Sequence, residues 1–362
     1  MLSKIRVLIV DDSAYSRQTI RGMFAADSDI EVVGIASNGI EAMAKTIKLK
    51  PDIITLDFEM PEMDGFSFLR WLMKERPTPV IMVSSHSDSK TVFRALELGA
   101  VDFIAKPTRR ASIELYSIKN DLLEKVKGIR ELRMDRLDIS RCLITESPPA
   151  LQAEAMGIRV EDTAGQQTSE FEVVAIGAST GGPAALQVIL TRLPSNFPAG
   201  ILISQHMPKG FTESFAERLN KLSRIRVKEA DDGDVVERGK ALICPGGYHL
   251  TLKRGDNGVR VALRNSTGKD KYTPSVNLMM TSVAEHFGPL SMGVVLTGMG
   301  NDGRQGIVEI KEKGGYTIAE SDSTAVVFGM PNEAIKTGAI DMVLPLNEIP
   351  GEITRAVMAR RD

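Results

Sequence analysis

The 362-residue chain is 43 % hydrophobic and 25 % charged, and its 45 basic and 47 acidic residues leave a net charge of −2. This composition is typical of globular proteins, and the chain is long enough for two domains. The near-neutral net charge gives no electrostatic surface for nucleic acid or anionic membrane. Cys142 and Cys244 are the only cysteines, which excludes a disulfide framework and a thiolate metal cluster.

The first apolar run, Ile5 to Val10, is too short and too charged for a signal peptide. No later segment approaches the length of a membrane span. We therefore expect a soluble cytoplasmic protein that neither inserts into a membrane nor binds nucleic acid.

Five short β-branched runs alternate with amphipathic segments in the first third of the chain. They read IRVLIV, IEVVGIA, DIITLD, PVIMVSS and DFIAKP. Such alternation predicts an α/β domain built on a doubly wound parallel sheet.

Polar side chains stand at the carboxyl ends of four of these runs, where open α/β sheets build their sites. A lone aspartate after a strand is commonly a helix N-cap, but three carboxylates, a hydroxyl and a lysine at four strand ends favour a site. Hard oxygen ligands suit Mg²⁺, and the set suits phosphoryl transfer to a carboxylate. The residues are Asp11, Asp12, Asp57, Ser84 and Lys106.

The segments VLIVDDS, DIITLDFEMPEMDG, VIMVSS and IAKP make residues 4–125 resemble a response-regulator receiver domain. The resemblance implies a flavodoxin-like fold with Asp57 as the phospho-acceptor and a chemotaxis histidine kinase as phosphodonor. It also implies that Asp11 and Asp12 bind Mg²⁺ together with Asp57. Ser84, where many receivers have threonine, would be the switch hydroxyl, and Lys106 would contact the phosphate.

The middle of the chain changes character. A charged stretch, SIELYSIKNDLLEKVKGIRELRMDRL, has a helical pattern, and TESPPALQAEAMGIRVEDTAGQQTSE lacks periodicity and is rich in Pro, Ser, Gln and Glu. We therefore expect a receiver over residues 1–125, a helix and flexible linker over 126–170, and a second domain over 171–362.

Strand–helix alternation resumes from Phe171. The strand-like runs are EFEVVAIGAS, AGILISQH, KALICPGG, GVRVALR, MGVVLTGM, YTIAES and DMVLPL. They predict a second doubly wound parallel sheet.

The turn VVAIGASTGGPAAL, from Val173 to Leu186, allows three interpretations. It fits the G-x-S-x-G pattern of a nucleophile elbow with Ser179 at its centre. It lacks the lysine of a Walker loop, and Ser179 replaces the second glycine of a dinucleotide turn. A tight turn without chemistry remains open at this point.

A nucleophilic serine needs a base and an orienting acid. His206 ends the strand-like run GILISQH and is the best base, and Asp302 follows the run MGVVLTGM, although Asp-Gly alone is typical of a turn. The order Ser–His–Asp matches none of the three familiar triad orders. Structural roles are favoured for the other candidates, which are His86, His249, His286 and Cys244.

The segments GASTGGP, ISQHMP, TPSVN, LTGMGNDG and FGMPNEAI make residues 171–357 resemble the effector domain of chemotaxis protein-glutamate methylesterases. The resemblance implies a Rossmann-like domain with Ser179 as nucleophile, His206 as base and Asp302 as its acid. Thr180 and Gly181, which follow the serine, are candidates for the oxyanion hole. Two departures concern the substrate rim: the family more often has aspartate at Asn277 and alanine at Arg304.

The resemblance implies a phosphorylation-activated esterase that acts on glutamyl methyl esters of methyl-accepting chemotaxis receptors, with glutamine deamidase activity and no cofactor for the esterase. Two alternatives are a transcription regulator and a docking or nucleotide-binding effector in which Ser179 caps a helix. We also expect the unphosphorylated receiver to cover the mouth of the esterase site.

Overall fold

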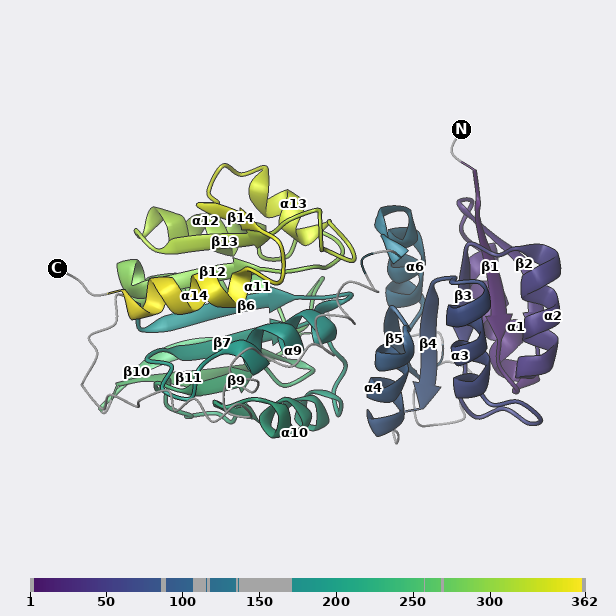
Figure 1. The fold of residues 1–362 in the computed structure, drawn as a ribbon, viewed down its shortest axis with the longest axis horizontal. Helices are drawn as coiled ribbons and strands as arrows, with labels where there is room; N and C mark the ends of the chain where they lie inside the picture. Colours follow the sequence, from purple (N-terminus) through teal and green to yellow (C-terminus); the bar gives the residue numbers. More distant parts are fainter. Residues whose placement is uncertain are drawn as a thin grey trace, which may run out of the picture. The chain divides into compact units, whose positions relative to one another are not determined.

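The structure is a computed structural model that describes residues 3–85, 89–106, 115, 118–134, 136, 171–256, 258–267 and 270–359. The chain divides into two compact units, Met1–Leu137 and Asp138–Asp362 (Figure 1). The linker expected over residues 145–170 lies outside the described residues, as do His86 and Cys142. Within the described part of the chain, no helix is long and apolar enough to cross a membrane.

The first unit contains a five-stranded parallel sheet in the order β2-β1-β3-β4-β5, which confirms the predicted doubly wound fold. All five predicted strands are present. They are β1 (Ile5–Val10), β2 (Ile30–Ala36), β3 (Ile53–Leu56), β4 (Val80–Ser85) and β5 (Asp102–Lys106).

Helices cover both faces of this sheet. Helix α1 packs with α6 on one face, and α2, α3 and α4 pack in sequence on the other. Their bounds are α1 (Ala14–Ala25), α2 (Gly39–Leu49), α3 (Gly65–Glu75), α4 (Ser89–Leu98) and α6 (Lys119–Lys127). Helix α6 straddles the boundary expected at residue 125, and its Leu122 and Val126 are fully buried in the core of this unit.

The second unit contains a seven-stranded sheet in the order β14-β13-β12-β6-β7-β9-β8, and every pairing in it is parallel. A second doubly wound sheet is thus confirmed. Its strands are β6 (Val173–Ala178), β7 (Gly200–Gln205), β8 (Arg226–Glu229), β9 (Lys240–Ile243), β12 (Ser291–Val295), β13 (Tyr316–Glu320) and β14 (Met342–Leu344).

The strand composition of this unit differs from the prediction at three places: β8 and the strand over Tyr248–Gly255 were not predicted, and a predicted strand lies outside the main sheet. GVRVALR is not part of the main sheet, because β11 (Gly258–Asn265) pairs antiparallel with β10 (Tyr248–Gly255) in a separate hairpin. The sheet instead gains β8 at its edge. Strand β8 escaped the sequence pattern because it is four residues long and only Val227 in it is buried.

Helices cover both faces of the larger sheet as well. One face carries α9, α10 and α14, and the other carries α11, α12 and the hairpin. The helices are α9 (Gly182–Arg192), α10 (Thr212–Leu222), α11 (Val276–Phe287), α12 (Arg304–Glu312), α13 (Met330–Ile335) and α14 (Ile349–Met358).

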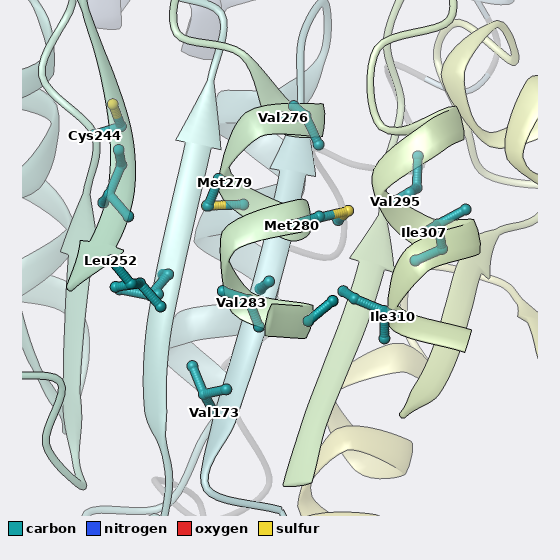
Figure 2. Packing of buried hydrophobic residues seen from close by; sticks show 14 of the residues in the cluster. Val173, Cys244, Leu252, Val276, Met279, Met280, Val283, Val295, Ile307 and Ile310 are labelled. Atoms are coloured by element: carbon teal, nitrogen blue, oxygen red, sulfur yellow. The ribbon is translucent and has the colours of Figure 1, made fainter. Parts of the chain in front are cut away.

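Helix α11 is the centre of the main hydrophobic cluster. Its apolar face, with Val276, Met279, Met280 and Val283 fully buried, packs on the sheet beside α12. Figure 2 shows Val276 at the end toward which the underlying strands point. Burying such side chains contributes about 1.5–3 kcal/mol each, so this packing fixes the start of α11 at the carboxyl edge of the sheet.

Candidate active site

Three adjacent strands of the larger sheet deliver the predicted triad residues to one edge. Ser179 follows β6, His206 follows β7, and Asp302 lies in the loop between β12 and α12. Backbone hydrogen bonds fix these exits, since Ser179 N donates to Thr297 O at 3.0 Å and His206 N donates to Ala178 O at 3.1 Å. The parallel register therefore places serine and histidine side by side.

The three side chains form a continuous hydrogen-bonded chain. His206 Nδ1 lies 3.1 Å from Ser179 Oγ, and His206 Nε2 lies 2.9 Å from Asp302 Oδ2. Ser179 is 6 % exposed and Asp302 only 1 %. A carboxylate can only accept, so the neutral ring donates from Nε2 and presents the Nδ1 lone pair to the hydroxyl. This is the arrangement that a general base requires.

Asp302 is held by the N-terminus of α11. Its carboxylate accepts from Val276 N at 2.7 Å, Asn277 N at 2.9 Å and the Ser275 hydroxyl at 3.3 Å. Burial alone would raise the pKa of Asp302, but the hydrogen bond and charge of His206 and the N–H groups of Asn277 and Val276 outweigh it and lower the pKa. The acid is therefore ionised and fixed in orientation.

Two further side chains touch the triad, and neither was identified from the sequence. The Tyr272 ring stacks on the His206 ring at a centroid distance of 5.0 Å and an interplanar angle of 6°. Gln205 is buried, and its Nε2 donates to Ser179 O at 2.9 Å and His206 O at 3.1 Å. Their only signals were their positions: Tyr272 directly precedes the segment TPSVN, and Gln205 lies within the segment ISQHMP.

The candidate oxyanion residues lie between Ser179 and the start of α9. Thr180 is 1 % exposed, and its carbonyl accepts from the Thr297 hydroxyl at 2.9 Å. Gly181 is the N-cap of α9 and has φ = +79°, a left-handed conformation that favours glycine. Both residues therefore lie at the positive end of a helix dipole.

A buried carboxylate is linked through Thr297 to the turn that carries Ser179. Glu320, at the end of β13, is fully buried and accepts from Thr297 N at 2.8 Å and the Thr324 hydroxyl at 2.9 Å. Burial raises its pKa to about 7. The Thr297 carbonyl in turn accepts the Ser179 N–H, so Thr297 links Glu320 to the backbone of the serine.

The remaining candidates of this unit lie outside the triad. His249 is buried and its Nδ1 accepts from Ser275 N at 3.1 Å, which supports the cap of α11. His286 bonds to the Ser282 carbonyl at 2.8 Å. Burial raises the pKa of the Cys244 thiol, which makes it unreactive.

The receiver residues gather at the carboxyl edge of the smaller sheet. Ligand oxygens of Asp11, Asp12 and Asp57 lie within 4.8 Å of one another. Lys106 Nζ lies 2.9 Å from Asp11 Oδ2 and also contacts Asp57 Oδ2. Burial raises the pKa of Asp11 to about 6, with Lys106 opposing and Asp57 adding to the increase.

This cluster fits a magnesium ion. Asp11 Oδ2 is buried, and its one contact among the described residues is the ion pair with Lys106 Nζ at 2.9 Å. An all-oxygen donor set with two buried carboxylates and exposed Asp12 matches the preference of Mg²⁺ for a few carboxylates plus water. Ser84 lies in β4, where its backbone pairs with Ala105 beside Lys106, and its side chain is outside the described part.

Comparisons with known proteins extend over both units. Family models match at residues 174–353, described as CheB methylesterase, and at residues 7–116, described as response regulator receiver domain. Protein-glutamate methylesterase/protein-glutamine glutaminase 3 of Geobacter sulfurreducens is 50 % identical over 362 residues, covering 97 % of either chain. The Pyrococcus abyssi protein-glutamate methylesterase/protein-glutamine glutaminase is 44 % identical over 358 residues, covering 98 % of this chain and 94 % of that protein.

One solved structure covers the second unit. The crystal structure of the Thermotoga maritima CheB methylesterase catalytic domain is 44 % identical in sequence and superposes with a TM-score of 0.50. It covers 52 % of this chain and 99 % of that chain.

Proposed function

The chain belongs to the CheB methylesterase family and carries a response-regulator receiver domain, and on this premise we propose that it is a serine hydrolase under phosphorylation control. Its substrate is the γ-methyl ester of glutamate residues on chemoreceptors, and its products are glutamate and methanol. Both family resemblances predicted from the sequence are confirmed. The observation that carries the proposal is the placement of His206 between Ser179 and Asp302.

The reaction uses a covalent intermediate. Ser179 Oγ attacks the ester carbonyl carbon while His206 Nδ1 takes its proton, and a tetrahedral oxyanion forms. Its collapse breaks the bond to the methoxy oxygen, which leaves as methanol with the proton from His206. A water, activated by the same nitrogen, then hydrolyses the glutamyl–Ser179 ester and frees the carboxylate and the serine.

Charge stabilisation comes from groups fixed before the reaction begins. Asp302 stabilises the imidazolium and holds its Nε2–H, and N–H groups at Thr180 and Gly181 meet the oxyanion at the start of α9. Tyr272 covers one face of the imidazole and limits ring rotation. None of these steps calls on a metal ion.

The same site also hydrolyses glutamine side chains. An amide carbonyl offers the same electrophilic carbon, and His206 delivers the proton to ammonia in place of methanol. The names of the two relatives include protein-glutamine glutaminase, which supports this second activity.

The receiver supplies the control. Asp57 accepts a phosphoryl group from a chemotaxis histidine kinase, and Asp11, Asp12 and Asp57 would hold the Mg²⁺ that neutralises charge during the transfer. Lys106 contacts the phosphate and Ser84 supplies the switch hydroxyl.

The test is methanol release from methyl-labelled receptor. Triad members act as a unit, so Ser179→Ala and His206→Ala each reduce kcat by about 10⁴–10⁶-fold, and the double variant little further. Ser195→Ala, an exposed serine in the loop after α9, is the matched control and retains full activity.

A fluorophosphonate probe separates this proposal from a docking effector. The wild-type chain is labelled at Ser179, and His206→Ala is labelled far more slowly because its serine has no base. Near-normal methanol release by folded Ser179→Ala, or no probe labelling at all, would overturn the proposal.

A further inference from the structure

Helices α11 and α12 begin side by side, and each is capped by a residue that belongs to the start of the other. The cap position of α12 is Gly303, which has no side chain to accept a hydrogen bond. Asn277 of α11 fills that role: its Oδ1 accepts from Gly303 N at 3.0 Å, Gln305 N at 2.9 Å and Gly306 N at 2.9 Å. One amide oxygen thus satisfies three N–H groups of the first turn of α12.

In the other direction, Asp302 adds to the cap that Ser275 makes for α11 by accepting from Leu278 N at 3.3 Å. Asp302 accepts the N–H groups of Val276 and Asn277 at the start of α11. The Gly303 N–H is shared, because it lies 3.0 Å from Asn277 Oδ1 and 3.1 Å from Asp302 Oδ1. Asn277 and Asp302 therefore hold each other's helices and meet at a single N–H group.

We propose that Asn277 is a positioning residue for hydrolysis, which holds Asp302 against His206 through this reciprocal cap without adding a second negative charge. The inference rests on the proposed function, because it assigns Asn277 to the Ser179–His206–Asp302 reaction. It also gives a role to a position that the sequence marked only as a departure from the family pattern.

The neutral amide matters because of what surrounds it. His206 hydrogen-bonds to Asp302 and carries Tyr272 stacked on its ring, and His249 accepts from the N–H of Ser275, whose hydroxyl donates to Asp302. On α12, the guanidinium of Arg304 pairs with Glu333 of α13 at 3.3 Å. An aspartate at position 277 would accept the same three N–H groups. It would also set a second carboxylate beside Asp302, which favours protonation of the His206–Asp302 pair.

Two substitutions test geometry and charge separately. Asn277→Ala removes the cap of α12 and lowers kcat roughly 10-fold with KM within about twofold, since substrate contacts are untouched. Asn277→Asp keeps the cap, so at high pH its kcat matches that of the wild type. The acid limb of its kcat/KM profile lies roughly half to one pH unit higher than in the wild type. The rate of Ser179 labelling by a fluorophosphonate follows the same pH shift.

Asn38→Ala is the matched control, because Asn38 caps α2 in the receiver by accepting from Glu41 N at 2.8 Å. It loses comparable stability and keeps the kcat and pH profile of the wild type. The inference is overturned if folded Asn277→Ala keeps wild-type kcat, or if the Asn277→Asp pH profile superposes on that of the wild type. Failure of the proposed function would appear differently, as activity that survives Ser179→Ala.

Discussion

His206 owes its orientation to both of its ring nitrogens. Nε2 donates to the Asp302 carboxylate, which four other donors hold in place, and Nδ1 faces Ser179. In the proposed mechanism, Asp302 therefore acts both as a cap of α11 and as the acid that orients His206. The N–H groups that hold Asp302 belong to α11 and to Gly303 at the start of α12. Movement of either helix start would therefore displace Asp302 and change the orientation of the His206 ring.

Glu320 is a second buried carboxylate at this edge, and it makes stability depend on pH. Its pKa is about 7 against an ordinary 4.5, so folding favours the protonated form. That contribution is complete below pH 4.5 and is lost as pH rises through about 7, at a cost on the order of 3 kcal/mol.

Glu320→Gln keeps a neutral side chain that can accept from Thr297 N and donate to Thr324. We expect its unfolding free energy to exceed that of the wild type at pH 8 and to match it near pH 5, measured by urea denaturation at each pH. Equal pH dependence in both proteins would show that folding does not raise the pKa of Glu320.

At the scale of elements, most of the fold follows from sequence periodicity. The five receiver strands and six of the seven strands of the larger sheet were predicted, because buried parallel strands are continuous apolar runs. Edge strand β8 and the placement of β11 in a hairpin were not, because an edge strand needs only one buried residue and a run does not reveal its partner.

The part of the site that follows directly from strand ends could be predicted from the sequence. Ser179, His206 and Asp302 follow apolar runs, and parallel strands end at one edge of the sheet. The stack of Tyr272 and the caps made by Asn277 and Asp302 could not, since they depend on how loops and two helix starts pack. Hydrophobic periodicity and turn residues in the sequence do not indicate such contacts.

The loop after β7 rests on the turn that follows β9. A Cβ added at Gly246 would lie 2.5 Å from Lys209 N and from the Pro208 carbonyl, which are backbone atoms that cannot rotate away. We expect Gly246→Ala to displace the loop that carries His206 and to lower kcat at least 10-fold while the domain stays folded.

Gly351→Ala is the control for this change. Gly351 lies in α14 with no atom within 4 Å of an added Cβ, so alanine there stabilises the helix by about 0.5–1 kcal/mol and leaves methanol release unchanged. Wild-type activity in Gly246→Ala would show that the loop after β7 does not depend on this packing.

At the scale of the whole molecule, the question is why a receiver and a hydrolase share one chain. We expect the unphosphorylated receiver to hinder access of a receptor helix, and phosphorylation to relieve it. A shift of about 2–3 kcal/mol between the two states gives roughly 30- to 150-fold activation. Residues 168–362, tested as a separate fragment, should release methanol several-fold faster than the unphosphorylated full chain.

The phosphodonor should accelerate only the full chain in that comparison. Equal rates for the fragment and the unphosphorylated full chain would exclude simple occlusion. If those rates are equal at saturating receptor and the fragment has a higher KM, the receiver would serve to dock the enzyme on its receptor.

The most direct test of the account measures methanol release from methylated receptor by the full chain, with and without a small phosphodonor and Mg²⁺. The account predicts that the phosphodonor accelerates the wild type at least several-fold, leaves Asp57→Asn at the basal rate, and elicits no release from Ser179→Ala. Acceleration of Asp57→Asn equal to that of the wild type, or release by Ser179→Ala, would contradict it.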